Sequence, residues 1–166
     1  MTTDTIEREE ASDTYSIPCY KIQLIRDSRP DVVRVSATSP AAAAAILRTF
    51  LGDPDVEHFV ILLLDTVNRP VGLHTVAIGS LNSAYIRPAD AFKAAILANA
   101  SSVVLCHNHP SGDTTPSRDD LAVTRTLVAA GKLLELQVLD HIILGEDGQY
   151  LSMAERGLVD FKGEDH

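Results

Sequence analysis

The sequence has few cysteines, no membrane-length apolar run and no cluster of basic residues. Its two cysteines, Cys19 and Cys106, are too few for a disulfide framework and do not form a C-x-x-C ligand pair. No apolar run approaches the roughly 18 residues that cross a bilayer. The N-terminus is acidic and polar, without the basic and apolar regions of a secretory signal. These absences predict a soluble, cytoplasmic protein without a membrane segment.

Positive charge is also scarce. The chain carries 14 Lys and Arg against 23 Asp and Glu, a formal net charge of −9. Proteins that bind nucleic acid directly gain affinity from clustered cations that displace counterions from phosphates. The composition therefore argues against direct nucleic-acid binding.

What is present is the composition of one globular domain. The chain has 166 residues, of which 45% are hydrophobic and 22% charged, and it contains no internal repeat. Residues 1–16 are acidic and lack hydrophobic periodicity, so they are expected to form a disordered tail. We expect a single domain over residues 17–160.

Hydrophobic periodicity predicts interleaved strands and helices. Two hairpins are expected from strands 20–27 with 32–37 and 57–65 with 71–79, and later strands at 101–107, 137–145 and 148–153. Helices are expected at 40–52, 88–99 and 118–134. Ser39 and Ser117 are expected N-caps, and Gly52 closes the first helix. The fold class is therefore α/β.

The stretch "HNHPSGDTTPSRDD" combines groups that could bind a metal ion. On a strand, His107 and His109 project to the same side and could reach one ion. The first turn of the following capped helix could return Asp120 to the same point. Two imidazoles and one carboxylate leave a fourth position open, which is typical of catalytic zinc.

The stretch also matches the pattern H-x-H-x(7)-S-x(2)-D, with Ser117 and Asp120 in place. With this pattern, "GSLNSA" and "LDHIILG", residues 57–159 resemble the RadC-like group of the JAB/MPN metalloprotease family and its JAMM motif. The resemblance implies a mixed β-sheet flanked by helices in a three-layer, cytidine-deaminase-like architecture. It does not cover the N-terminal extension, and the helix-hairpin-helix segment usual in full-length RadC proteins is not found.

The resemblance further implies a Zn²⁺ site with His107, His109 and Asp120 as ligands and Ser117 as a donor to the bound water or oxyanion. It implies a hydrolase of peptide, isopeptide or other amide bonds, acting on a peptide or protein. In active relatives a glutamate on an earlier strand is the general base for the zinc-bound water. Zinc lowers the pKa of that water to about 7, so the base has only to relay the proton.

Position 74 departs from the family's pattern. Aligning "NRPVGLHTVAIGSLNSA" places His74 where RadC relatives carry the glutamate. His74 could be a replacement base, a third imidazole ligand that closes the site, or a packing residue. The second functional hypothesis follows: a zinc-binding but catalytically idle module that binds a partner protein or peptide.

Other candidates carry less weight. His141 is either a hydrogen-bond partner of a ligand or a structural residue. Cys106 is expected to face the core, opposite His107. Ser111 and Asp113 lie in a loop that could contact substrate. A nucleoside deaminase is excluded because H-x-E and P-C-x-x-C are absent. Apolar edges near residues 71–79 leave a dimer open.

Overall fold

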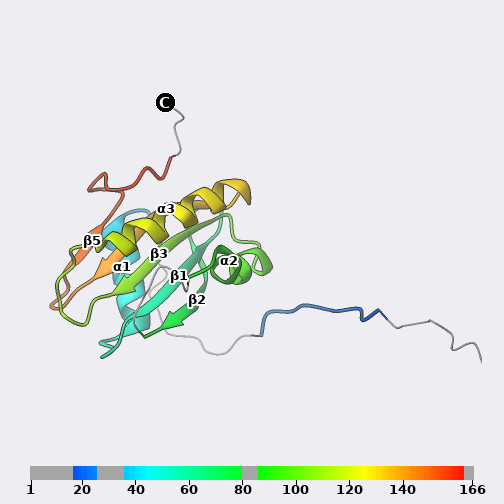
Figure 1. The fold of residues 1–166 in the computed structure, drawn as a ribbon, viewed down its shortest axis with the longest axis horizontal. Helices are drawn as coiled ribbons and strands as arrows, with labels where there is room; N and C mark the ends of the chain where they lie inside the picture. Colours follow the sequence, from blue (N-terminus) through cyan, green and yellow to red (C-terminus); the bar gives the residue numbers. More distant parts are fainter. Residues whose placement is uncertain (1–16, 26–35, 80–85, 163–166) are drawn as a thin grey trace, which may run out of the picture.

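The computed structural model describes residues 17–25, 36–79 and 86–162. The acidic tail expected at residues 1–16 lies outside the described residues. Figure 1 shows the ordered elements gathered into one body, with residues 17–25 extending away from it. Among the described residues, no helix is long and apolar enough to cross a membrane.

Five strands form one mixed sheet in the order β2-β1-β3-β4-β5. The strands are β1 (His58–Leu64), β2 (Pro70–Ile78), β3 (Ser102–Asn108), β4 (Gln137–Leu144) and β5 (Tyr150–Ser152). β1 pairs antiparallel with both β2 and β3, β3 pairs parallel with β4, and β5 runs antiparallel to β4. β3 is therefore the central strand, and its two neighbours, β1 and β4, are distant from it in sequence.

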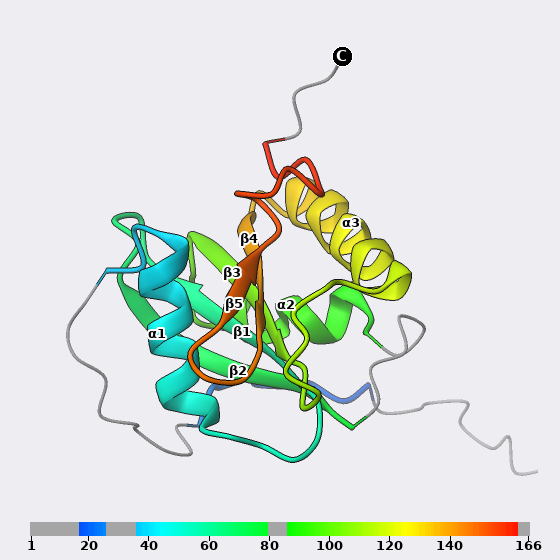
Figure 2. The ribbon, with the colours of Figure 1, turned by 90° about the vertical axis from the view of Figure 1, so that its left-hand side faces the viewer.

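Helices cover both faces of the sheet. α1 (Pro40–Leu51) lies on one face, and α2 (Pro88–Leu97) and α3 (Arg118–Leu133) lie on the other, as Figure 2 shows. A separate apolar core fills each interface. The predicted α/β fold with a mixed sheet flanked by helices is confirmed.

Strand parity decides which core each side chain of β1 and β3 enters. Phe59, Ile61 and Leu105 pack with α2 and α3, whereas Val60 and Cys106 pack with α1. Both strands are buried on both faces, which is why they read as continuous apolar runs rather than alternating ones. The next residue after Cys106 therefore points toward α3.

The first helix begins and ends as its sequence predicts. The Ser39 side chain accepts a hydrogen bond from the backbone of Ala42, and Pro40 occupies the first helical position. Gly52 closes the helix with a φ of 65° and donates its N–H to Arg48. The Arg48 guanidinium in turn donates to the carbonyl of Gly145, 3.0 Å away, and so ties α1 to the β4–β5 turn.

The N-terminal hairpin predicted from strands 20–27 and 32–37 is not found in the described residues. Residues 20–25 have no regular secondary structure and are exposed, so the strand predicted at 20–27 is wrong over this part. Alternation alone does not make a strand, because the backbone also needs a hydrogen-bonding neighbour, and the described residues supply none. Residues 26–35, including most of the second predicted strand, lie outside the described residues.

Candidate metal centre

The carboxyl end of β3 holds two histidines on the face covered by α3. His107 is 1% exposed, and its Nε2 atom lies 2.8 Å from Nε2 of His109, just beyond the strand. The other ring nitrogen of His107, Nδ1, lies 2.8 Å from Nε2 of His141 on the neighbouring β4. The two imidazoles thus converge through their Nε2 atoms, as strand parity predicts.

The start of α3 brings a carboxylate to the same point. The Ser117 hydroxyl oxygen accepts from the Asp120 N–H at 3.0 Å, and the Ser117 N–H donates to Asp120 Oδ2 at 2.7 Å. This reciprocal capping box fixes the Asp120 side chain in the first helical turn. Asp120 Oδ1 lies 3.3 Å from His107 Nε2, and Oδ2 lies 3.7 Å from His109 Nε2.

These distances suit a divalent cation. Among the described residues, His107, His109 and Asp120 are the group whose ligand atoms lie close enough to hold a metal ion, all within 4.8 Å of one another. Tetrahedral zinc with bonds of about 2.0–2.2 Å would place its ligand atoms roughly 3.3–3.5 Å apart. The two pairs that involve the carboxylate are near this spacing, and the imidazole pair has to open by about half an ångström.

The hydrogen bonds of His109 point to the same conclusion. Its Nδ1 atom lies 2.5 Å from the backbone carbonyl of Asp113, which can only accept, so Nδ1 carries a proton. In the neutral ring, Nε2 then presents a lone pair toward the Asp120 carboxylate. A metal ion between them would accept this lone pair and balance the carboxylate charge, whereas without an ion the contact is a hydrogen bond from a protonated Nε2. The residues present therefore fit a metal ion.

The charge distribution around Asp120 agrees with this reading. Burial alone would raise the pKa of Asp120, but hydrogen bonds from His107, His109 and Ser117 outweigh it and hold that pKa well below its usual range. Burial, followed by the charge of His107, lowers the pKa of the fully buried His141, which is therefore a neutral imidazole. The site thus combines an ionised carboxylate with a neutral imidazole, His141, behind His107.

A glutamate that the sequence reasoning missed also faces this centre. Glu57 directly precedes β1 and shares the strand parity of Phe59, whose ring stacks with that of His107 at 6.3 Å. Extending the β1–β3 register places Glu57 across from His109. The hydrogen bond with Asp120 is the main cause that raises the pKa of His109, and the Glu57 charge adds to the rise. The half-buried Glu57 carboxylate therefore lies beside the histidines.

Asn108, between the two histidines, holds the backbone around Glu57. Its side chain points away from the metal group. It accepts from the His58 N–H at 2.8 Å and donates to the Val56 carbonyl at 3.0 Å. On the other side, the Glu57 carbonyl accepts from Gly79 at 2.8 Å. The peptide groups on both sides of Glu57 are therefore fixed by residues of β3 and β2.

The structure does not bring His74 into the metal group. His74 pairs with Ile61 of β1, which pairs with Leu105 of β3, two residues before His107. Two strand spacings and two residues along the strand separate the backbones of His74 and His107 by roughly 12 Å. Burial lowers the pKa of His74, against a hydrogen bond with the backbone of Asp90 on α2. Its catalytic role stays a prediction, as does that of Ser117.

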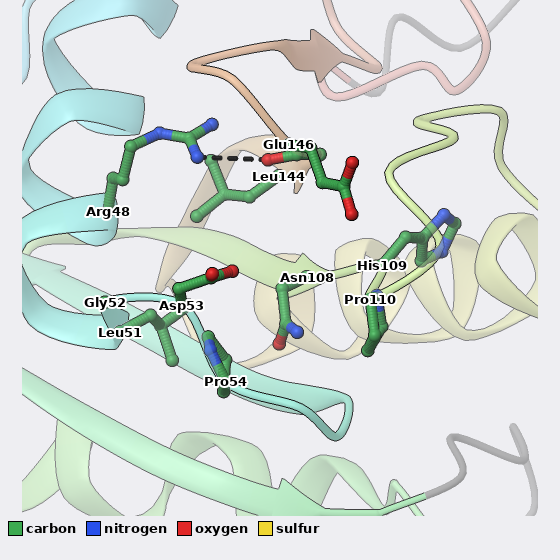
Figure 3. Close-up of a pocket in the computed structure, with 11 residues that line it drawn as sticks. Arg48, Leu51, Gly52, Asp53, Pro54, Asn108, His109, Pro110, Leu144 and Glu146 are labelled. Atoms are coloured by element: carbon green, nitrogen blue, oxygen red, sulfur yellow. Dashed lines mark hydrogen bonds between the residues drawn. The ribbon is translucent and has the colours of Figure 1, made fainter.

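A small pocket opens beside His109 at this end of the sheet (Figure 3). Asn108, His109 and Pro110 line one wall, and Arg48 from the end of α1 and Glu146 from the β4–β5 turn line others. His109 lines this pocket, whereas His107 and Asp120 do not.

Two other side chains, Cys106 and Asp65, lie away from the metal group, and Cys106 faces the core as the sequence predicts. Cys106 is fully buried in the core beneath α1, opposite His107, and burial raises its thiol pKa. Asp65 caps the β1–β2 turn by accepting from the N–H groups of Val67 and Arg69. Neither contributes to the metal group.

Comparison with known proteins assigns the chain to a family. The RadC-like JAB domain family matches residues 37–158, a span that contains all three candidate ligands and Glu57. The chain belongs to this family. The resemblance drawn from the H-x-H-x(7)-S-x(2)-D pattern is thereby confirmed.

Individual relatives of this RadC-like JAB domain support the assignment. A UPF0758 protein of Chloroflexus aggregans is 50% identical over 125 residues, which cover 75% of this chain and 54% of the relative. UPF0758 protein TTE0897 of Caldanaerobacter subterraneus is 46% identical over 127 residues, covering 76% of this chain and 54% of the relative. The chain thus spans about half the length of the curated relatives it matches.

Proposed function

We propose that this domain hydrolyses an amide bond in a peptide or protein, at a divalent metal held by His107, His109 and Asp120. The observation that carries the proposal is the position of the Glu57 carboxylate beside this buried three-ligand group. Zinc is the proposed ion because two imidazoles and a carboxylate with an open fourth position match the ligand pattern of catalytic zinc sites. When bound, it would polarise a carbonyl group and lower the pKa of water to about 7.

Glu57 is suited to move the proton that such a reaction requires. As the oxygen of a water molecule bonds to the carbonyl carbon, Glu57 receives one proton from that water. Glu57 then passes the proton to the amide nitrogen, and the C–N bond breaks. Asn108 and Gly79 hold the backbone on both sides of Glu57, so the carboxylate reaches the site from a fixed position.

Ser117 is suited to stabilise negative charge on the substrate. Its hydroxyl oxygen already accepts from the Asp120 N–H, which leaves the hydroxyl proton to donate. Ser117 is exposed at the entrance of the site, so a substrate carbonyl can reach it. A hydrogen bond to the oxygen where charge develops lowers the barrier of acyl transfer.

The position of Glu57 favours it over His74 as the base, and paired variants test the choice. The probes are zinc-loaded protein with fluorescently labelled casein and with lysine-branched isopeptides. Glu57→Gln should reduce turnover by about 100- to 10,000-fold while zinc content stays unchanged. His74→Ala is the control and should retain turnover.

Two results would overturn this assignment. Turnover that survives in Glu57→Gln and disappears in His74→Ala would identify His74 as the base. Zinc-loaded wild-type protein that cleaves none of the probes would favour the idle module that binds a partner. In that case a pull-down with the same peptides would show binding that Glu57→Gln leaves intact.

A further inference from the structure

Behind His107, away from the metal group, lies a buried chain of hydrogen bonds. His107 Nδ1 is 2.8 Å from His141 Nε2, and His141 Nδ1 is 2.5 Å from the Thr124 hydroxyl. The same hydroxyl lies 2.5 Å from the backbone carbonyl of Asp120. His141 and Thr124 are both 0% exposed, so water does not supply alternative partners.

The carbonyl at the end of this chain sets the direction of every proton. A carbonyl oxygen can only accept, so the single hydroxyl proton of Thr124 is donated to Asp120. The Thr124 oxygen is then left with lone pairs toward His141, and the Nδ1 atom of His141 must carry a proton. With its proton on Nδ1, the imidazole ring of His141 presents the lone pair of its Nε2 atom to His107.

The last link fixes the tautomer of a metal ligand. Since His141 Nε2 accepts, Nδ1 of His107 must donate, and the lone pair of neutral His107 lies on Nε2. That nitrogen is the one that faces Asp120 at 3.3 Å. The opposite tautomer would put a proton where the metal ion has to bind.

The His141 ring is itself held in place by its surroundings. Its backbone N–H donates to Asp140 Oδ1 at 2.7 Å, and the same carboxylate binds Ser152 and Ala154 at the end of β5. The ring of Phe59 packs against its edge at a centroid distance of 5.4 Å and an angle of 72°. Rotation of the ring away from His107 would break its contact with Phe59 and its hydrogen bond with Thr124.

We infer that His141 and Thr124 are positioning residues, which hold His107 in the Nδ1–H tautomer and so make its Nε2 atom the metal-binding nitrogen. The inference rests on the proposed metal site, but it concerns residues that would touch neither metal nor substrate. Partners of this kind commonly change metal affinity by about 10- to 100-fold when they are removed.

Two substitutions of Thr124 distinguish a role in this chain of hydrogen bonds from a role in packing alone. Thr124→Val keeps the shape and removes the hydroxyl, whereas Thr124→Ser keeps the hydroxyl and removes a methyl group. If the hydrogen bonds set the tautomer, zinc binding should weaken about 10- to 100-fold in Thr124→Val and stay nearly unchanged in Thr124→Ser, as measured by competition with a chelator. A packing role predicts the reverse order.

A neighbouring threonine provides the matched control. Thr126 lies on the same helix, is exposed, and its hydroxyl donates to the Ala122 carbonyl at 3.0 Å without contacting a histidine. Thr126→Val should bind zinc as the wild type does. If Thr124→Val does not fold, Thr124→Ala against Thr124→Ser gives the same comparison, since both lack the methyl group and differ in the hydroxyl.

The tautomer can also be read without metal, from long-range nitrogen-15 correlation spectra of the histidine rings. The wild type should show His107 protonated at Nδ1, and Thr124→Val should shift the proton toward Nε2. Wild-type protein that binds no zinc would refute the proposed function. Zinc binding by the wild type with equal affinity in Thr124→Val, and an unchanged tautomer, would refute this inference alone.

Discussion

Replacement of Asn108 by alanine tests how the segment around Glu57 is held. Asn108 is 6% exposed and makes two side-chain hydrogen bonds, one to the His58 N–H and one to the Val56 carbonyl. A neutral hydrogen bond contributes about 0.5–1.5 kcal/mol net, and the two backbone groups left behind are only partly buried. Asn108→Ala should therefore lower the free energy of unfolding by about 1–3 kcal/mol.

Zinc binding should respond differently from stability in this variant. Both histidines and Asp120 remain, so we expect zinc affinity within about threefold of wild type, whereas any turnover that depends on Glu57 should fall by roughly 100-fold because the carboxylate is misplaced. Urea unfolding followed by circular dichroism measures the free energy of unfolding, and chelator competition measures the zinc affinity.

A variant of similar stability provides the control for Asn108→Ala. Leu47, on α1, is fully buried against the opposite face of the sheet, and Leu47→Ala should cost about 2–5 kcal/mol without moving Glu57. The reasoning would be refuted if Asn108→Ala unfolded at the same urea midpoint as the wild type. It would also be refuted if the variant lost more free energy of zinc binding than free energy of unfolding.

Two further predictions concern buried groups away from the metal. Cys19 is exposed and Cys106 is buried with a raised thiol pKa, so a thiol reagent should modify Cys19 in the native protein and both thiols after denaturation; native modification of Cys106 would contradict its placement. Burial raises the pKa of Asp140 above 3.8, so its contribution to stability is present below pH 3.8 and is lost as pH rises through the folded-state pKa. Unfolding measured from acid to neutral pH should therefore show wild type losing stability relative to Asp140→Asn as pH rises, and parallel curves would contradict this.

Patterns of residues close in sequence predicted most of the secondary structure. The limits of α1 follow from Ser39 and Gly52, and the capping box of α3 follows from Ser117 and Asp120, since each depends on residues close in sequence. The convergence of His107 and His109 required only the two-residue period of a strand. These features were therefore within reach of the sequence.

The order of the strands in the sheet could not be predicted from such local patterns. Glu57 and His109 are brought together because β1 lies between β2 and β3, a pairing that no short pattern encodes. The family's pattern indicated His74, which lies on the neighbouring β2, whereas Glu57 directly precedes β1. The choice between structural and metal-supporting roles for His141 needed its contact with His107, across the parallel β3–β4 pair.

Zinc stoichiometry after loading and removal of excess ion tests the central claim most directly. The wild type should retain one zinc ion per chain, and His107→Ala, His109→Ala and Asp120→Ala should each lose it. Asp119→Ala, which removes the adjacent exposed carboxylate of the same helical turn, should retain it. A metal-free wild type, or zinc retained in all three ligand variants, would contradict the account.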